Sequence, residues 1–166
     1  MKKRCVKSLV RLNNPLAARE YAFLLLKFRL RSEEEIALRL RQKKFSEEVI
    51  RETICFLKDK NFIDDSVFAK AWVNSRLKRP LGLRRIQEEL RQKGIDKKII
   101  EDQIFEVKKD YPEDKIVARI AGERLSKLKK VEPICAKRRV YSYLIRRGFS
   151  ADLVLETVNK LCKPTY

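Results

Sequence analysis

Several residue types are scarce or missing in this sequence of 166 residues. It has no histidine, only four glycines and five prolines, and four widely separated cysteines, none in CxxC spacing. Zinc sites are usually built from closely spaced cysteines and histidines, so a metal role is disfavoured. A glycine-rich phosphate loop and a serine in an elbow motif are also missing. Because each common catalytic arrangement lacks an essential part, the sequence predicts a protein that is not an enzyme and needs no cofactor.

Long hydrophobic segments are missing as well. The longest apolar run, YAFLLLKF at residues 21–28, contains a lysine and is far shorter than the roughly 20 residues that span a bilayer. The first residues, MKKRCVKSLVRL, are basic but lack the apolar stretch and cleavage site of a secretion signal. Cys55 and Cys162 fall in apolar-periodic segments, where a thiol packs as a small hydrophobic group. These features predict a cytoplasmic protein with free cysteines and no membrane partner.

Acidic residues are few relative to basic ones. The 41 lysines and arginines exceed the 23 aspartates and glutamates, which gives a formal net charge of +18. A charge of this size creates a field that concentrates polyanions. A generally charged surface, as in thermophile proteins, explains a high charge density but not this imbalance. The sequence therefore predicts an anionic partner.

The sequence also contains a repeated phrase. LRQKGIDKKIIEDQI at residues 90–104 closely matches LRQKKFSEEVIRETI at residues 40–54, and LIRRGFSADLVLETV at residues 144–158 is a looser third copy. Such spacing is typical of repeat architectures. Apolar residues recur at helical intervals in each copy, which predicts two amphipathic helices joined by a short turn. The aligned apolar positions are Ile36, Ile86 and Val140; Leu40, Leu90 and Leu144; Phe45, Ile95 and Phe149; Val49, Ile99 and Leu153; Ile54, Ile104 and Val158.

The turns between these helices carry their own signals. Gly94 and Gly148 stand where a helix ends in the left-handed conformation that glycine adopts easily. Lys44 replaces the glycine in the first copy, so that copy either ends its helix differently or accepts a left-handed residue other than glycine at a cost of about 1 kcal/mol. Of these two, we predict a slightly different turn. Residues that favour N-caps then begin the next helix: Ser46, Asp96 and Ser150. Upstream, Asn13 or Asn14 before Pro15 and a capping box of Ser32 with Glu35 are further helix starts.

A further helical pattern precedes each pair of helices, from Arg19, Ser66 and Lys115. A three-helix unit of this size buries little surface alone, so neighbouring units should stack. The sequence therefore predicts an all-α fold of three tandem three-helix repeats, stacked into an elongated, curved, right-angled helical array. The predicted domains are a basic N-terminal tail at residues 1–14 and repeats at residues 15–62, 63–110 and 111–166.

Two features have both a functional and a structural interpretation. The adjacent Asp64 and Asp65 fit metal ligands or an acid–base pair, but their place directly before a helix favours capping. Trp72 fits a platform on which a nucleic-acid base stacks, but its stripe with Ala69 and Val73 is more typical of a helix core.

The copies differ in charge at equivalent positions. The second and third carry Arg84–Arg85 and Arg138–Arg139 where the first carries Glu34–Glu35. This difference predicts that an anionic partner contacts the second and third repeats, although an ordinary solvated face has the same pattern. The candidate contact residues are Lys78, Arg79, Arg84, Arg85, Arg91, Lys93, Arg138, Arg139, Arg146 and Arg147.

The segment at residues 62–95 resembles the signature of the bacterial RecX family. It has a paired aspartate, an aromatic-alanine step, an arginine, and a glycine-led helix that ends in a leucine, a basic residue and KGI. RRGFS at residues 146–150 resembles the closing motif of the family. The resemblance runs from about Pro15 to Leu161, and its specificity lies in order and spacing. Lys44 departs from the pattern, since a glycine often stands there.

The resemblance implies tandem three-helix repeats and a regulatory role in recombination and DNA repair. Members of the family bind the RecA recombinase filament on single-stranded DNA and modulate, usually inhibit, its ATPase, growth and strand exchange. The ten basic residues are then candidate filament or DNA contacts in a monomer, with direct contact to single-stranded DNA left open. A helix-turn-helix DNA-binding protein is the main alternative, but three related helix pairs rich in Lys, Arg and Glu do not favour it. A plain helical scaffold is the other alternative.

Overall fold

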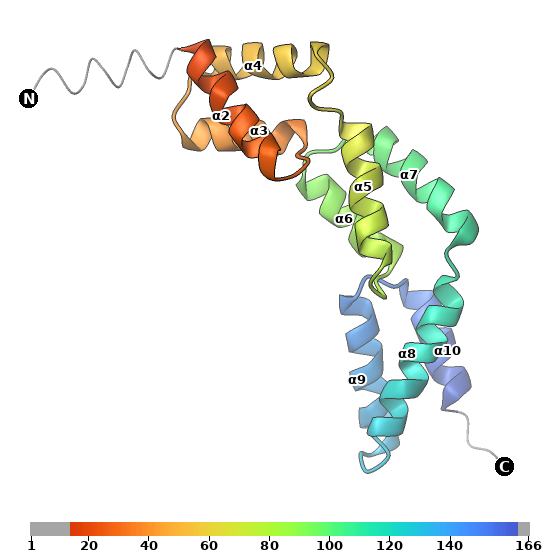
Figure 1. Cartoon of the computed structure of the whole chain (residues 1–166). Coiled ribbons are helices and arrows are strands. Elements are labelled where there is room, and N and C mark those ends of the chain that lie inside the picture. Colours follow the sequence, from red (N-terminus) through yellow and green to blue (C-terminus); the bar gives the residue numbers. More distant parts are fainter. Residues whose placement is uncertain (1–13, 163–166) are drawn as a thin grey trace, which may run out of the picture. The chain divides into compact units, whose positions relative to one another are not determined.

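The computed structural model describes residues 14–162, and this part of the chain consists of nine α-helices and no β-strand (Figure 1). The all-α prediction is confirmed. Predictions for the basic tail and Cys5 lie outside the described residues, and the repeat boundaries stay a prediction. The helices are α2 (Pro15–Phe28), α3 (Glu33–Gln42), α4 (Glu47–Asp59), α5 (Asp65–Leu77), α6 (Leu83–Gln92), α7 (Lys97–Asp110), α8 (Glu113–Lys127), α9 (Pro133–Arg146) and α10 (Ala151–Leu161).

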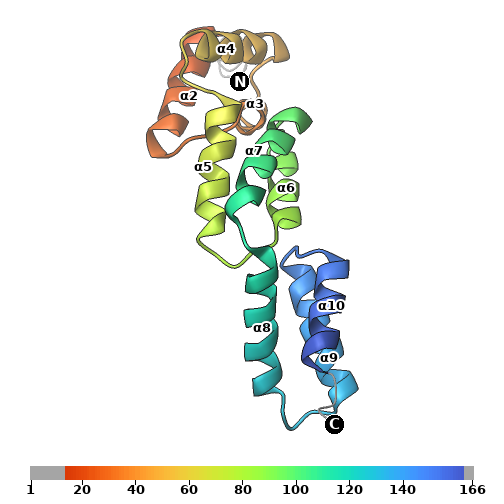
Figure 2. The ribbon, with the colours of Figure 1, turned by 90° about the vertical axis from the view of Figure 1, so that its right-hand side faces the viewer.

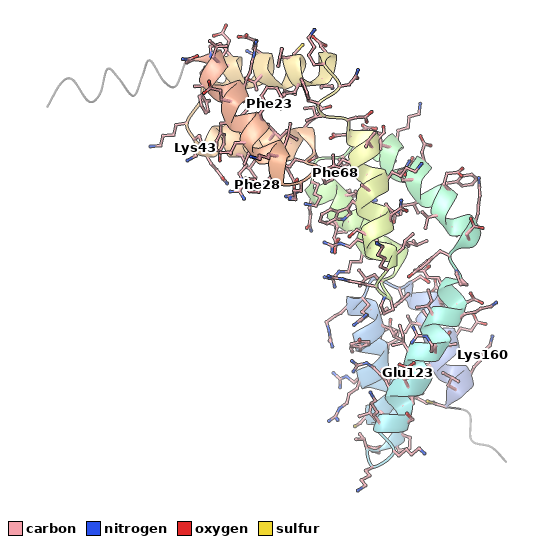
Figure 3. All side chains as sticks on the ribbon, in the orientation of Figure 1. Phe23, Phe28, Lys43, Phe68, Glu123 and Lys160 are labelled. Atoms are coloured by element: carbon pink, nitrogen blue, oxygen red, sulfur yellow. The ribbon has the colours of Figure 1, made fainter. Side chains whose placement is uncertain are left out.

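The chain divides into two compact units, and the first comprises the residues up to 71 together with residues 91–99. In this unit α2, α3 and α4 pack against one another (Figure 1). Ala18 and Ala22 of α2 are fully buried, which lets the helix backbones approach closely. Phe23, labelled on α2 in Figure 3, packs edge-on against Phe62 with the ring centroids 4.8 Å apart. The core residues are Ala18, Ala22, Ile36, Ala37, Leu40, Val49, Ile50, Leu57 and Ile63.

The second unit comprises residues 72–90 and the residues from 100 onward. Its helices α8, α9 and α10 lie side by side (Figure 2). The division passes through α5, α6 and α7, so each of these helices contributes residues to both units. The core of α8 to α10 consists of Val117, Ile120, Ala121, Val140, Leu144, Phe149, Val154 and Val158.

The predicted apolar register is confirmed in the second helix of each copy. All six aligned residues there are fully buried: Ile36, Ile86, Val140, Leu40, Leu90 and Leu144. At the start of the third helices the more deeply buried positions are Ile50, Ile100 and Val154, one residue after the predicted Val49, Ile99 and Leu153. Val49 is buried, but Ile99 and Leu153 are only half-buried. Further along the third helices, Ile104 and Val158 are buried as predicted and Ile54 is half-buried, so the shift of one position is confined to the first turn.

The turn between the second and third helices has the same conformation in all three copies. Lys44, Gly94 and Gly148 have φ values of +65°, +76° and +87°, all in the left-handed region. In the first turn the amide of Phe45 donates to the carbonyl of Leu40 at 3.2 Å, and Phe149 and Leu144 form the equivalent bond at 3.3 Å. The predicted different turn at Lys44 is therefore wrong, because a lysine accepts this conformation at a cost of about 1–2 kcal/mol.

Most of the predicted caps are present. Asn14, Ser46 and Asp96 each accept a hydrogen bond from an amide in the first turn of the following helix. Asp64 does the same for α5, where it accepts from Ser66 at 2.7 Å. Ser150 stands at the predicted N-cap position of α10, but its hydroxyl makes no capping hydrogen bond, so only the position is confirmed.

Asp65 has a different role from the one predicted. Its carboxylate accepts a hydrogen bond at 3.0 Å from the amide of Glu33, at the start of α3, instead of capping its own helix. Burial, more than the nearby charge of Glu33, raises the pKa of Asp65, and the amide opposes this rise. Glu113 of α8 repeats the arrangement, since it accepts at 2.9 Å from the amide of Leu83 at the start of α6. An acid on the first helix of one copy thus caps the second helix of the copy before it.

Two further expectations need correction. Cys55 is exposed and its thiol lies 3.7 Å from Asp59, so it does not pack as a hydrophobic group, whereas the half-buried Cys162 does pack on the core of the second unit. Trp72 is half-buried and donates from Nε1 to Glu89 at 3.1 Å. Its ring therefore joins a polar cluster at the edge of the core.

Candidate anion-binding surface

An open hollow on α8 and α9 has a volume of about 460 Å³. We call it the arginine hollow, because four of the seven side chains that line it are arginines and none is a carboxylate. Its lining residues are Arg124, Cys135, Arg138, Arg139, Ser142, Tyr143 and Arg146.

The periodicity of α9 explains how the arginine hollow forms. Residues 135, 138, 139, 142, 143 and 146 recur at intervals of three and four, so they share one face of the helix. On another face, Val140 and Leu144 are fully buried in the core of the second unit. Burial of this apolar stripe fixes the rotation of α9 and leaves Arg138, Arg139 and Arg146 exposed.

Tyr143 positions the arginine that α8 supplies. The guanidinium carbon of Arg124 lies over the Tyr143 ring, 3.2 Å from its centroid, and that of Arg147 lies 4.9 Å away. A guanidinium that stacks on an aromatic ring keeps its N–H groups available at the edge. Glu123, labelled on α8 in Figure 3, pairs instead with Arg119 at 2.9 Å. The charge of Arg124 is therefore held in place without an acidic partner among residues 14–162.

The adjacent arginines Arg84 and Arg85 of α6 are both exposed but differ in their contacts. Arg84 is exposed and makes no ion pair with a described residue. Arg85 contacts Glu89 at 3.3 Å and donates at 3.1 Å to the backbone carbonyl of Arg146. Burial raises the pKa of Glu89, but hydrogen bonds from Arg76 and Arg85 outweigh it and the net pKa is lowered. Glu89 thus stays ionised and its charge is neutralised locally.

The structure brings together some of the ten predicted contact residues and not others. Arg138, Arg139 and Arg146 meet in the arginine hollow. Lys78 and Arg79 are exposed in the turn before α6, where Arg147 donates to the carbonyl of Pro80 at 2.9 Å. Arg91 and Lys93 belong to the first unit, whereas the other eight belong to the second.

Lys93 has a structural role. Its side chain is only 17% exposed, and its Nζ lies 2.6 Å from Glu35 and 5.8 Å from the ring centroid of Phe68, which Figure 3 labels on α5. Arg29 donates to the same carboxylate at 2.8 Å, so Glu35 does not complete the predicted capping box with Ser32. An ammonium held in this way is poorly placed to bind a partner.

The sequence did not identify Arg124, although it lines the arginine hollow. Only the second and third helices of the copies align, so no comparison between copies marks a residue of α8. Its partner Tyr143 lies nineteen positions later in the chain. The contact depends on how α8 packs on α9, which the sequence pattern does not specify.

Within residues 14–162 no three His, Cys, Asp or Glu side chains gather in a way that could hold a metal ion. No helix of this part is long and apolar enough to cross a membrane.

The fold and the arginine hollow define a helical repeat protein with a basic hollow whose lining contains no carboxylate. Models of the first and second three-helix domains of RecX match residues 18–57 and 64–102. The regulatory protein RecX of Mycobacterium sp. (strain KMS) is 33% identical over 151 residues, which cover 88% of this chain and 82% of the relative. That of Finegoldia magna is 37% identical over 130 residues, which cover 77% of this chain but only 63% of the relative. The chain belongs to the RecX family of regulatory proteins.

Solved structures share the fold. The crystal structure of RecX from Lactobacillus salivarius has a TM-score of 0.75 and 24% identity, and the match covers 89% of this chain and 96% of that one. A second crystal structure of regulatory protein RecX has a TM-score of 0.76 and 19% identity, with 95% and 77% covered. The recognition of the family from its signature is therefore confirmed, and the family is one of regulators and not of enzymes.

Proposed function

We propose that this protein binds the RecA recombinase filament assembled on single-stranded DNA and slows its ATP hydrolysis, growth and strand exchange. Membership of a family of regulatory proteins supports a regulatory role in recombination. The observation that carries the contact is the arginine hollow of the second unit, whose lining contains four arginines and no carboxylate, because a nucleoprotein filament is a polyanion. In this proposal the protein acts in the cytoplasm as a monomer.

A regulator without catalytic groups can act only through differential binding. If it binds one state of the filament more tightly than another, it shifts the population toward that state. Slower hydrolysis and exchange follow when the favoured state is the less active one. The effect should saturate with the amount of protein bound, and it should weaken with salt because the contact is electrostatic.

The exposure of the side chains supports a smaller set of basic residues for this contact. Lys78, Arg79 and Arg84 are exposed in the second unit, as are the three α9 arginines of the hollow. Arg85 and Arg147 donate hydrogen bonds to backbone carbonyls, so part of their donor capacity is already engaged. We therefore leave Arg85, Arg147 and Lys93 out of the primary contact set.

The proposal is tested with RecA on single-stranded DNA. ATP hydrolysis and strand exchange are measured against increasing amounts of this protein, and both rates should fall to a plateau. Binding to RecA-coated single strands, bare single strands and duplex is compared across salt concentrations, and the coated strand should bind best. If both rates stay unchanged when the filament is saturated, the proposed function is wrong.

A further inference from the structure

We propose that the outer face of α2 is a docking site for an acidic amphipathic helix of a partner protein. The site lies in the first unit, so the inference goes beyond the proposed function, whose contact set lies on the second unit. The site consists of exposed apolar side chains, which we call the α2 patch. Its residues are Leu16, Phe23, Leu24, Phe28 and Phe62.

The outer face of α2 lacks the polar residues that a surface helix usually carries there. One side of this helix is buried in the core of the first unit through Ala18 and Ala22. Six other residues of α2 are exposed, yet only Glu20 and Lys27 among them are charged, and the other four belong to the α2 patch. In α6, by contrast, every exposed residue is polar. Contiguous apolar surface of this kind on a globular unit marks an interaction site.

Aromatic rings give the α2 patch a fixed shape. Four of the eight phenylalanines in the chain lie on α2 and in or just after the last turn of α4. The Phe23 ring meets Phe56 edge-on as well as Phe62, with the centroids of Phe23 and Phe56 6.4 Å apart. Phe28, labelled on α2 in Figure 3, is 76% exposed, the highest value among the large apolar side chains of residues 14–162. Large aromatic side chains that become buried contribute strongly to protein interfaces.

Lysines flank the α2 patch and indicate the charge of its partner. Lys27 lies on the outer face of α2, and Lys60 directly follows α4. Lys43, labelled in Figure 3, has its Nζ 5.4 Å from the ring centroid of Tyr21 on α2. All three lysines are exposed and make no ion pair with a described residue, whereas Glu20 is the one exposed acid of α2. A partner that covers the apolar side chains should therefore carry acidic residues beside its own apolar stripe.

The same charges disfavour other occupants of the α2 patch. Residues 1–13, which lie outside the described part of the chain, include five lysines and arginines and no acid. A second copy related by a two-fold axis would bring the flanking lysines of both chains together. An anionic bilayer attracts the lysines but repels Glu20, which lies among the exposed apolar residues. An acidic amphipathic helix satisfies both the apolar surface and the lysines beside it.

The docking site is tested with a designed peptide in place of the partner. The probe is a labelled peptide of about 15 residues, long enough to run along α2, with leucines on one helical face and glutamates elsewhere. The control peptide has the same composition in scrambled order. Fluorescence anisotropy should show that the probe binds at least about tenfold more tightly than the scrambled peptide. Both peptides have equal charge, so general attraction to a protein of net charge +18 does not produce this difference.

Two pairs of variants of the full chain locate the binding. L24A/F28A should remove the preference for the probe over the scrambled peptide. Its matched control is F105A/I134A, which truncates two exposed apolar side chains outside the α2 patch and should keep the preference.

The second pair of variants tests the flanking lysines. K27Q/K43Q/K60Q should bind the probe several-fold more weakly than K108Q/K129Q/K130Q, which removes three exposed lysines of the second unit and has the same net charge. Circular dichroism checks that all four variants stay folded. Equal binding of the two peptides, or equal losses in a variant and its control, would overturn the proposal.

Cross-linking from position 28 distinguishes between the occupants. Phe28→p-benzoylphenylalanine places a photoreactive ketone in the α2 patch, and the protein is irradiated alone, with the probe, and with phosphatidylglycerol vesicles. Mass spectrometry should find a cross-link to the probe that excess unlabelled probe abolishes. A cross-link to residues 1–13, to a second copy or to lipid that the probe does not displace would overturn the proposal. Because RecA is absent from every arm, failure here leaves the proposed function untouched.

Discussion

Gly148 packs so closely against Arg85 that a Cβ atom on the glycine would lie 2.3 Å from the Cβ of the arginine. Gly94 stands in the same relationship to Glu34, where the corresponding distance is 2.4 Å. Each glycine belongs to the turn of one copy and meets the second helix of the copy before it. Lys44 occupies the equivalent turn of the first copy and is exposed. Glycine is therefore required at these turns by packing between copies, in addition to the left-handed conformation.

This relationship predicts opposite outcomes for equivalent positions. Gly94→Ala and Gly148→Ala should each lower the free energy of unfolding by about 2–4 kcal/mol, the sum of left-handed strain and overpacking. Lys44→Gly should change it by less than about 1 kcal/mol, because relief of strain offsets the greater freedom of the unfolded chain. Urea unfolding measures all three. Equal losses of stability at the three positions would contradict the role assigned to packing between copies.

A second prediction concerns the acids that cap the preceding copy. Asp65→Ala and Glu113→Ala remove the acceptors for the amides of Glu33 and Leu83, and each should cost about 1 kcal/mol. Hydrogen exchange read by NMR should accelerate at the Glu33 amide in the first variant and at the Leu83 amide in the second.

Asp64→Ala is the matched control for these variants. Its carboxylate accepts from Ser66 and Val67 within its own helix, so exchange should accelerate at those amides and not at Glu33. If Asp65→Ala left the Glu33 amide unchanged, the cap between copies would be refuted.

Much of the fold could be predicted from the sequence because helical periodicity and turn residues are local signals. The fully buried Ile86 and Leu90 and the left-handed Gly94 follow directly from their spacing. Contacts between copies could not be predicted in this way. Asp65 reads as a cap for its own helix, and only the fold shows that it reaches Glu33 of another helix.

The sequence likewise predicted some residues of the candidate site and missed others. Arg138 and Arg139 stand out because the first copy carries Glu34 and Glu35 at the same places. Lys93 looked equivalent by charge, but its partner Glu35 comes from a helix far away in the sequence. Arg124 carried no signal, since only packing of α8 on α9 brings it to Tyr143. Charged residues at equivalent positions can be found by aligning the copies. The residues with which they form ion pairs or stack depend on tertiary structure and cannot be found in this way.

The ion-paired Glu35 predicts a dependence of stability on pH. Burial raises its pKa, but hydrogen bonds from Arg29 and Lys93 outweigh it and lower the pKa from 4.5 to about 2. Because the folded state holds the ionised form more strongly, the stabilisation is present above pH 4.5 and is lost as the pH falls toward 2. After allowance for solvent screening it amounts to about 1–2 kcal/mol.

Glu35→Gln isolates this contribution. Urea midpoints of the two proteins should differ most at neutral pH and converge as the pH falls to about 2, because both side chains are then neutral. Glu156→Gln is the control, since the fully exposed Glu156 pairs with Lys160 alone among the described residues and its loss should leave the midpoints nearly unchanged at every pH. If the difference between the urea midpoints of Glu35→Gln and wild type stayed constant with pH, ionisation of Glu35 would not be its cause.

The exposed arginines of α6 and α9 are predicted to contribute to binding of the RecA filament. R84E/R138E/R139E reverses three exposed charges that make no ion pair in the described part of the chain, so the fold should persist. Arg85 is left unchanged, because a glutamate there would face Glu89 and could not donate to the Arg146 carbonyl. Filament binding should weaken at least about tenfold, and its dependence on salt should flatten because fewer phosphates are neutralised.

The control for this variant is K2E/K3E/R4E, which makes the same change in charge in the N-terminal tail, outside the described residues. The two triple variants have equal net charge, so any difference between them reports position and not total field. The tail variant should retain most of the affinity, and both should keep wild-type circular dichroism. If the tail variant bound the filament more weakly than the helix variant, the filament contact would have to be assigned to the N-terminal tail instead of to α6 and α9. The same change in total charge would then reduce filament affinity more when it is made in the tail.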